Sequence, residues 1–325
     1  MNEIDDDKLE KLVATAAEKM SRVRAAVEST LVGQTFVLNQ TLISLLANGH
    51  ILLEGVPGLG KTLLVKTLTS VFSGKYSRIQ FTPDLMPADV TGHSMFNMKT
   101  QEFEIRQGPV FANFLLADEI NRAPAKTQAA LLEVMQEAQV TIEGKTLSTP
   151  KPFMVLATQN PIEQDGTYPL PEAELDRFMM KVFIEYPENE AEIEMAELVL
   201  GNAGSMKPPA QVATQEDLVK LQALVRLILV DRKVVEYAVN LVRATREWPG
   251  ISRGAGPRGS IALLACAKAA ALMDNSPFVT PDHVKAVATP VLRHRLLLSA
   301  ELQIEGVSPD VVLYEILQKI EVPRT

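Results

Sequence analysis

Apolar runs of strand length alternate with helix-like stretches through the first part of the chain. A run that is apolar throughout, rather than at every second position, is typical of a parallel strand buried on both faces. The alternation therefore predicts an α/β fold, with a parallel sheet covered by helices on both sides. The predicted strands are residues 51–54, 76–81, 114–117, 153–157 and 179–184.

Helical patterns precede and separate these strands. Residues 8–30 contain neither proline nor glycine and are predicted to form one or two helices, and residues 36–47 a further helix that ends near Asn48-Gly49. The clearest pattern covers residues 127–138, where Leu131, Leu132 and Met135 share one helix face.

Two segments alternate apolar and polar residues about a short turn, which is the pattern of a β-hairpin. They are residues 94–106 and 139–148. Hairpins inserted into a parallel α/β core are expected to protrude and to serve function. The alternative is that they are edge strands that cover a margin of the sheet.

Strand patterns fade after Tyr186-Pro187, and helix starts take their place. Thr214 with Asp217 three residues later resembles a capping box, and Thr280-Pro281 and Ser308-Pro309 each combine an N-cap residue with proline at the first helical position. We therefore expect an α/β core with its N-terminal helices at residues 1–187, a connector at 188–209 and an all-helical domain at 210–325.

Composition and charge narrow the class of protein. The 325 residues carry a formal net charge of −8, which disfavours sequence-independent binding to nucleic acid. No uncharged apolar run approaches the length of a membrane span, and the acidic N-terminus does not resemble a signal peptide. The lone cysteine, Cys266, lies in an apolar run and is expected to be buried. These features predict a cytoplasmic protein, and the four histidines show no zinc-ligand spacing.

The strongest chemical signal is the phosphate-binding loop that follows the first predicted strand. Its glycines let the backbone N–H groups converge on a phosphate, and the helix that follows adds its positive dipole end. Lys61 supplies a charge for the outer phosphates, and the Thr62 hydroxyl suits Mg²⁺. The residues expected to bind ATP or ADP here are Gly55, Pro57, Gly58, Leu59, Gly60, Lys61, Thr62 and Leu63.

The predicted strand at 114–117 leads into two carboxylates, Asp118 and Glu119. Beside a phosphate loop, Asp118 is expected to hold Mg²⁺ and Glu119 to orient and polarise the attacking water. The strand at 153–157 leads to Asn160, which could reach that water or the γ-phosphate, although Asn160-Pro161 is also an ordinary turn sequence.

Two arginines have weaker local arguments. Arg177 lies between an acidic and an aromatic residue, and from its neighbours alone a surface salt bridge is the simpler interpretation. Arg258 is expected in the first turn of an apolar helix, where a cation is unfavourable unless an anion binds nearby.

Four segments together resemble the MoxR family of AAA+ ATPases, and the resemblance extends over essentially the whole chain. They are GVPGLGKT, FLLADEINRAP, LATQNPIEQDGTYPLPEAELDRF and GAGPR. The resemblance implies an αβα nucleotide core with inserted hairpins, a helical lid, and a ring, usually hexameric, with ATP sites between subunits.

The resemblance also implies roles for single residues. Gly33 and Gln34 would flank the adenine, and Asn160 would be sensor 1. Arg177 would be the arginine finger for the neighbour's nucleotide, and Arg258 would be sensor 2, released by hydrolysis so that the lid can rotate. The family usually has Ser where this chain has Gly256 and Ala where it has Gly259, which leaves the placement of Arg258 open.

The function implied is Mg²⁺-dependent ATP hydrolysis that remodels, assembles or activates partner complexes, with metal insertion as one form. Clients would include proteins with von Willebrand factor A domains. The alternatives are a nucleic-acid motor, like the minichromosome-maintenance helicases of the same clade, and a nucleotide switch without turnover. The mixed charge of the hairpins argues against the motor.

Two basic features have no assigned role at this stage. Arg122 follows the acidic pair and is a candidate for contact with a neighbouring subunit. The triplet Arg293-His294-Arg295 is expected to be a solvated helix face.

Overall fold

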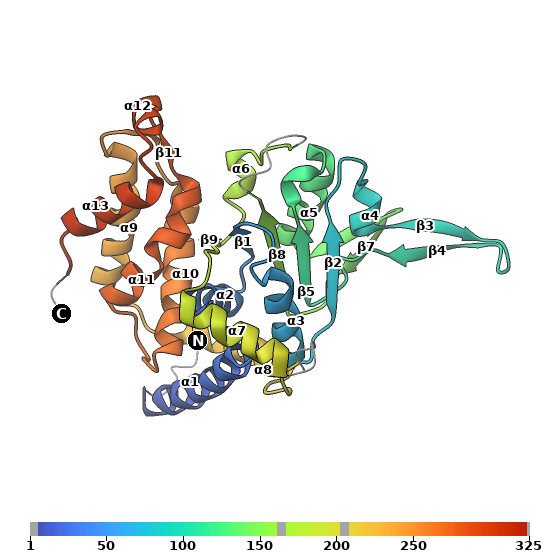
Figure 1. The fold of residues 1–325 in the computed structure, drawn as a ribbon, viewed down its shortest axis with the longest axis horizontal. Coiled ribbons are helices and arrows are strands. Elements are labelled where there is room, and N and C mark those ends of the chain that lie inside the picture. The colour runs from blue at the N-terminus through green and yellow to red at the C-terminus, as the bar shows by residue number, and fades with distance from the viewer. Residues whose placement is uncertain (1–5, 161–166, 202–207, 324–325) are drawn as a thin grey trace.

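A five-stranded parallel sheet forms the centre of the computed structural model, which describes residues 6–160, 167–201 and 208–323. The strand order is β2-β5-β8-β1-β9 (Figure 1). All neighbours are parallel, so the carboxyl ends of the strands meet at one edge of the sheet. The five predicted strands are confirmed as β1 (Ile51–Glu54), β2 (Tyr76–Gln80), β5 (Phe114–Asp118), β8 (Met154–Gln159) and β9 (Met180–Phe183).

Helices cover both faces of this sheet, because its strands are apolar on both faces. Leu53 packs in one cluster with α2 (Thr35–Leu46) and α3 (Lys61–Val71). Leu52, one residue earlier on β1, packs in a second cluster with α5 (Ala125–Glu137) and α4 (Pro87–Thr91). Successive side chains of a strand point to opposite faces, so the two clusters define the αβα layers that the pattern predicted.

The predicted hairpins are also confirmed. The first consists of β3 (Gly92–Asn97) and β4 (Glu102–Gln107), and the second of β6 (Gln139–Ile142) and β7 (Lys145–Ser148). Neither hairpin pairs with the central sheet, so the interpretation as sheet-edge strands is wrong. The first projects well beyond the core (Figure 1).

Helix α1 (Asp6–Glu28) forms one continuous helix at the N-terminal end of the chain. It packs against α3 of the core and against α10 (Pro257–Met273) of the C-terminal region.

The C-terminal region is helical, as expected. The predicted caps are present: the hydroxyls of Thr214, Thr280 and Ser308 accept backbone hydrogen bonds from residues in the first turns of the helices that follow them, α8 (Gln215–Leu227), α11 (Pro281–Leu292) and α13 (Pro309–Lys319). A two-stranded ladder of β10 (Ile251–Arg253) and β11 (Leu297–Leu298) is a departure from the all-helical prediction, since segments this short leave no strand pattern. The remaining helices are α9 (Arg232–Glu247) and α12 (Ala300–Ile304).

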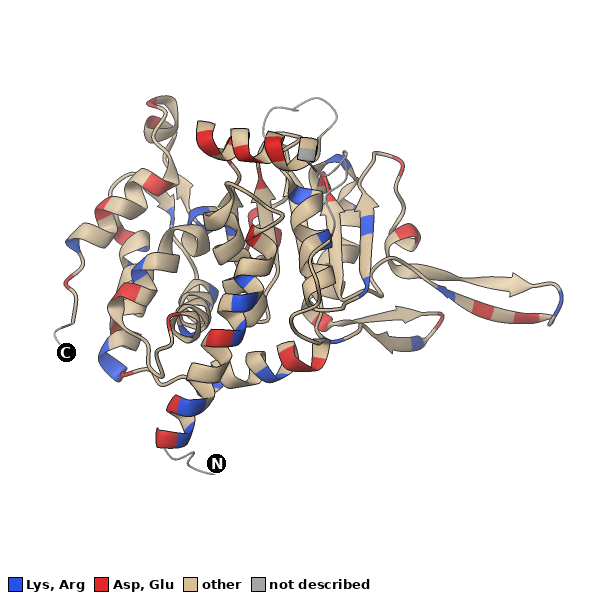
Figure 2. Cartoon of the chain, turned by 60° about the horizontal axis from the view of Figure 1, so that its bottom comes forward, with Lys and Arg blue, Asp and Glu red and all other residues tan. Residues whose placement is uncertain are grey.

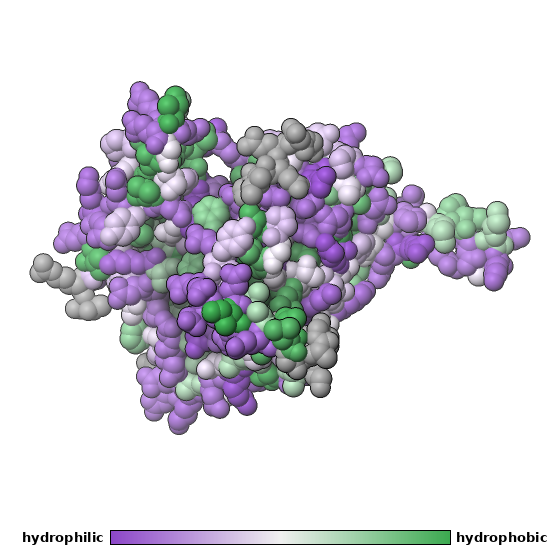
Figure 3. All heavy atoms as spheres, viewed as in Figure 1, coloured by the Kyte–Doolittle hydropathy of each residue, from purple (hydrophilic) through white to green (hydrophobic). Residues whose placement is uncertain are grey.

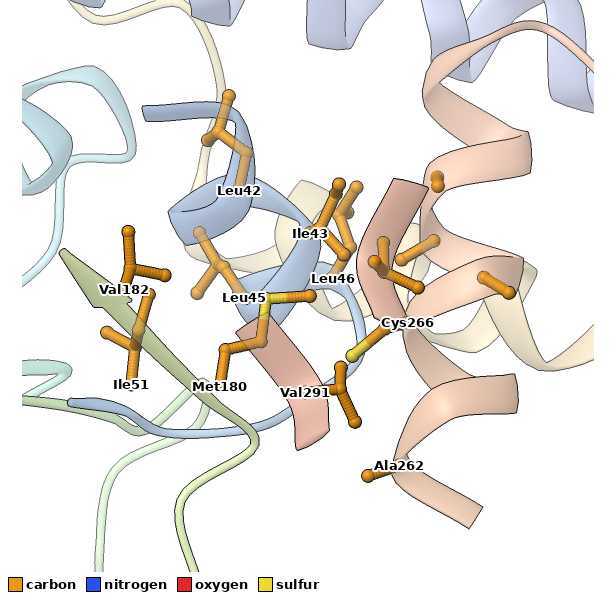
Figure 4. Packing of buried hydrophobic residues seen from close by; sticks show 14 of the residues in the cluster. Leu42, Ile43, Leu45, Leu46, Ile51, Met180, Val182, Ala262, Cys266 and Val291 are labelled. Atoms are coloured by element: carbon orange, nitrogen blue, oxygen red, sulfur yellow. The ribbon is translucent and has the colours of Figure 1, made fainter. Parts of the chain in front are cut away.

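This helical region shares a hydrophobic core with the α/β core. Leu45 of α2, Met180 of β9, Cys266 of α10 and Val291 of α11 belong to one buried cluster (Figure 4). The expected burial of Cys266 is confirmed, and this burial raises the pKa of the thiol to about 12. The C-terminal helical region therefore packs against α1 and α2.

The segment expected to be a connector begins with a helix, α7 (Asn189–Gly201). Its sequence is rich in glutamate and leaves Ile193 and Leu200 exposed, so it lacks the apolar stripe that usually identifies a helix. The glycine-rich stretch after it lies mostly outside the described residues. None of the described helices is long and apolar enough to span a membrane.

Candidate nucleotide site

The phosphate loop joins β1 to α3 with the backbone shape that its glycines allow. Gly58 and Gly60 have φ angles of 90° and 80°, a region that other residues rarely adopt. A Cβ on Gly55 would lie 2.5 Å from the carbonyl oxygen of Ile184, so that position requires glycine. No side chain caps α3, which leaves its first N–H groups directed at the loop.

Lys61 begins α3 and lies beneath the loop. Its ammonium group donates a hydrogen bond to the carbonyl oxygen of Gly55. Partial burial lowers the pKa of Lys61, while the carboxylates of Asp118, Glu119 and Glu54 act in the opposite direction. The two carboxylates of the acidic pair therefore stabilise the charged form of Lys61.

The acidic pair at the end of β5 is held by Thr158 of the neighbouring strand β8. The Thr158 hydroxyl donates to Asp118 Oδ1 at 2.6 Å and accepts a hydrogen bond of 2.9 Å from the backbone N–H of Glu119. Glu119 has φ 56° and ψ 50°, a left-handed conformation that is strained for a residue with a side chain. One buried hydroxyl therefore fixes both carboxylate residues.

Strand β2 adds two further polar residues to the site. Arg78 Nη2 lies 2.6 Å from Asp118 Oδ2, and Gln80 Nε2 donates to Glu119 Oε2 at 2.7 Å. Sequence reasoning missed Arg78, Gln80 and Thr158. Arg78 and Gln80 lie two positions apart on β2, so their sequence pattern places them on one face of the strand. Only the pairing of β2 with β5 brings that face to Asp118.

Arg122 follows the acidic pair in the short helix η1 (Ile120–Arg122). Its Nη1 lies 3.1 Å from Glu119 Oε2, so Arg122 contacts the acidic pair within the same chain.

The phosphate loop, the acidic pair and the polar residues of β2 and β8 line one cavity of about 450 Å³ at the carboxyl edge of the sheet. Thr62, Asp118 and Asn160 all line it together with Lys61. Among the described residues, no three His, Cys, Asp or Glu side chains gather to hold a metal by themselves. A hydroxyl and a carboxylate beside a phosphate loop fit Mg²⁺, which prefers oxygen ligands and is usually completed by phosphates and water. The lining residues are Pro57, Gly58, Gly60, Lys61, Thr62, Leu63, Arg78, Gln80, Asp118, Glu119, Thr158 and Asn160.

Gly33 and Gln34, expected to flank the adenine, lie where α2 begins and α7 approaches. The Gln34 amide donates to the carbonyl oxygen of Glu185 at 3.0 Å. Gly33 has a φ of 76°, and an added Cβ would lie 2.8 Å from Cβ of Ala191. Both residues thus meet the segment that follows β9, outside the lining of the phosphate-loop cavity.

Arg177 and Arg258 line a different cavity, of about 290 Å³, between the α/β core and the helical region. Arg177 follows α6 (Glu172–Leu175), and Arg258 lies in the first turn of α10, as predicted. The Arg258 side chain is 59% exposed and lies 3.9 Å from Asp176 Oδ2. Neither arginine is among the residues that line the phosphate-loop cavity of the same chain.

The expectation that Arg293-His294-Arg295 forms a solvated helix face is wrong. The triplet forms a short helical turn, η2 (Arg293–Arg295), between α11 and β11; Arg293 and His294 are buried, and the Arg295 side chain is 4% exposed. Each arginine forms an ion pair: Arg293 with Asp310 at 2.7 Å and Arg295 with Asp176 at 2.7 Å. Sequence alone could not show this, because Asp176 lies 119 residues away.

Comparison with known proteins agrees with this arrangement. Residues 50–180 match the model of the ATPase family associated with various cellular activities (AAA), and residues 243–316 match the AAA lid domain. A crystal structure of a Cytophaga hutchinsonii protein assigned as an ATPase is 41% identical, with a TM-score of 0.91, over 97% of this chain and 98% of that one.

Two curated relatives carry the same family name. Chaperone MoxR1 of Mycobacterium tuberculosis is 43% identical over 96% of this chain and 84% of its own length. Protein MoxR of Methylorubrum extorquens is 27% identical over 90% of this chain and 92% of its own. The chain therefore belongs to the MoxR family of AAA+ ATPases.

Proposed function

We propose that this protein hydrolyses ATP with Mg²⁺ in a ring, usually a hexamer, whose reaction centre is completed by the neighbouring subunit. One observation carries the proposal: Lys61, Asp118, Glu119 and Asn160 share one cavity, whereas Arg177 lines another. Arg78 also lines the first cavity but pairs with Asp118, so we assign the arginine that reaches the γ-phosphate to a neighbouring subunit.

Within one subunit, the backbone of the phosphate loop and Lys61 bind and neutralise the β- and γ-phosphates. Thr62 and Asp118 would hold Mg²⁺, which supplies charge stabilisation to the phosphates when bound. Glu119, held by Gln80 and Thr158, orients the attacking water, and Asn160 contacts that water or the γ-phosphate. Gly33 and Gln34 would flank the adenine.

Arg177 and Arg258 line the same cavity, so we assign both to the neighbour's nucleotide. This assignment replaces the sequence-based expectation that hydrolysis releases Arg258 and lets the lid rotate over its own site. We make the change because the lid packs on α1 and α2 of its own subunit, through α10. An arginine finger supplied from a neighbouring protein contributes roughly 10³–10⁵ in rate elsewhere.

The work done with this hydrolysis would be the remodelling, assembly or activation of partner protein complexes, of which metal insertion is one form. The named chaperone relative supports this class. Clients with von Willebrand factor A domains, a cytoplasmic location, and a division into core 1–187, connector 188–209 and lid 210–325 belong to the same proposal.

A nucleic-acid motor is the weaker candidate. Acidic and basic residues are interspersed along the first hairpin (Figure 2), with Glu102 and Glu104 beside Arg106. Alternating charge does not form the continuous positive groove that tracks a phosphate backbone. A steep salt dependence of binding to single-stranded DNA would favour the motor instead. A nucleotide switch without turnover would bind ATP and release no phosphate at any protein concentration.

Mixed rings test the proposal. Arg177→Ala subunits keep their own acidic pair, and Glu119→Gln subunits keep their finger. Each variant alone should be nearly inactive. A mixture should regain turnover at interfaces where Glu119 of one subunit meets Arg177 of the other.

The matched control mixes Arg177→Ala with a double variant that carries both changes, because no complete site can then form. Differential tags identify rings that contain both types. Isolated mixed rings of the two single variants that remain inactive would overturn the proposed role of Arg177.

A further inference from the structure

The buried turn η2 links the lid to the segment that carries Arg177. Residues 176–179 form a turn and a bend between α6 and β9, and their backbone N–H groups bond to carbonyl oxygens of α6 and of His50. The carbonyl oxygens of Asp176, Phe178 and Met179 accept from side chains outside the segment, and such contacts hold the backbone on both sides of Arg177.

Arg295 holds that backbone. Its side chain is 4% exposed, and its guanidinium donates to groups on both sides of Arg177. Before Arg177, Nε donates to Asp176 Oδ1 at 2.7 Å and Nη2 to the Asp176 carbonyl oxygen at 3.3 Å. After it, Nη2 donates to the carbonyl oxygen of Phe178 at 2.8 Å and Nη1 to that of Met179 at 3.2 Å. The planar fork of arginine makes such a multiple contact, and lysine has no equivalent.

His294 of η2 also binds the backbone next to Arg177. Its Nε2 lies 3.1 Å from the carbonyl oxygen of Phe178, so this nitrogen carries the proton and donates it. Burial lowers the pKa of His294 well below its usual value, so the ring is neutral.

Arg293 anchors the other side of the turn. It pairs with Asp310 of α13 and lies over the Phe183 ring, with its guanidinium carbon 4.2 Å from the ring centroid. Arg293 is therefore a neighbouring buried arginine whose ion pair and ring contact lie with Asp310 and Phe183 rather than with residues 176–179.

Burying a guanidinium is costly unless it is fully hydrogen-bonded, and an apolar side chain could fill the same volume at lower cost. Here Nη1 of Arg295 also donates to the carbonyl oxygen of Val291, and the other donors converge on residues 176–179, a half-buried segment in which Phe178 belongs to the core. Asp176 also lies 3.9 Å from Arg258, so two arginines of the lid meet that segment at a single carboxylate.

We propose that Arg295 is a positioning residue for the arginine finger: it fixes Arg177 for the neighbour's nucleotide and makes that placement depend on how the lid sits in its own subunit. This inference rests on the proposed role of Arg177. The partner it serves is a second copy of this chain, at the γ-phosphate end of that copy's nucleotide.

The test is Arg295→Lys, with Arg293→Lys as the matched control at the adjacent buried position. A finger displaced by about 1 Å loses roughly 10²-fold in rate, so homogeneous Arg295→Lys rings should turn over 10- to 100-fold more slowly. Their affinity for a fluorescent ATP analogue should stay unchanged, because their own phosphate loop is intact. Arg293→Lys should keep most of the turnover.

Mixed rings separate positioning from general damage. Arg295→Lys mixed with Glu119→Gln should regain turnover, as Arg177→Ala does, because the intact finger then comes from the Glu119→Gln subunit. Wild-type turnover of Arg295→Lys, or no recovery on mixing, would overturn the inference. If Arg177→Ala recovers and Arg295→Lys does not, only this inference fails. If neither recovers, the proposed function fails first.

A second variant covers the case in which Arg295→Lys does not fold. Asp176→Asn removes the carboxylate from the opposite end of the same contact, and it should show the same loss and the same recovery. Failure of both variants to fold or to form rings would establish a purely structural contact and would also overturn the inference.

Discussion

Thr158 offers a sharp test of how the acidic pair is held, because one hydroxyl serves both residues. Its side chain is 1% exposed, and valine has nearly the same shape, so Thr158→Val leaves no cavity. The substitution removes the hydrogen bond to the Asp118 carboxylate and leaves the Glu119 N–H without its acceptor.

The magnitude follows from those two losses. A hydrogen bond to a charged group contributes about 1.5–3 kcal/mol, and an unsatisfied buried donor costs about 1–3 kcal/mol. Arg78 still pairs with Asp118, so we expect the free energy of unfolding to fall by about 2–4 kcal/mol. Turnover should fall at least 10-fold, because the strained backbone of Glu119 loses the contact that holds its left-handed conformation.

Urea unfolding and steady-state ATP turnover measure the two effects. Thr158→Ser is the control, because it keeps the hydroxyl and loses only a methyl group, at a cost of about 1 kcal/mol. Thr158→Val that is as stable and as active as Thr158→Ser would refute the assignment of this hydroxyl.

Three further predictions concern other parts of the chain. Arg78→Ala should lower the Mg²⁺ concentration needed for half-maximal turnover roughly 3- to 5-fold, because Asp118 is freed from a partly exposed ion pair that contributes up to about 1 kcal/mol. An unchanged or higher Mg²⁺ requirement would contradict this. Burial lowers the pKa of His50 from 6.5 to about 4, so the unfolded chain binds the extra proton and stability falls between pH 6.5 and pH 4. The full difference is about 3 kcal/mol, and unfolding curves of a His50→Gln variant should lack this part of the pH dependence. Cys266 should resist iodoacetamide in the folded protein and react after unfolding; rapid labelling of the folded chain would contradict its burial.

The first hairpin carries large exposed apolar side chains. The side chain of Met98 is 87% exposed and that of Phe103 71%, and Figure 3 shows an apolar patch along this arm. This placement agrees with the sequence-based expectation that the hairpin protrudes.

The sequence predicted what local chemistry decides. An apolar strand followed by a glycine-rich loop specifies the phosphate site, because the glycines at 58 and 60 need positive φ angles. Thr214, Thr280 and Ser308 cap helices through their own hydroxyls, so those helix starts could also be predicted.

The remainder depends on which segments become neighbours. Arg78 reaches Asp118 only because β2 pairs with β5, and strand order is not written in the pattern of either strand. The burial of Arg295 depends on Asp176, so a basic triplet that looks solvated became part of the interior. Helix α7 was missed because it covers little of the core.

In the proposed function, one subunit cannot complete its own reaction centre. The most direct measurement is ATP turnover per subunit as the protein is diluted from rings to single chains, with sedimentation recorded at each concentration. Wild-type turnover should fall to the level of Arg177→Ala rings as single chains appear. Single chains that hydrolyse ATP as fast as rings would contradict the account.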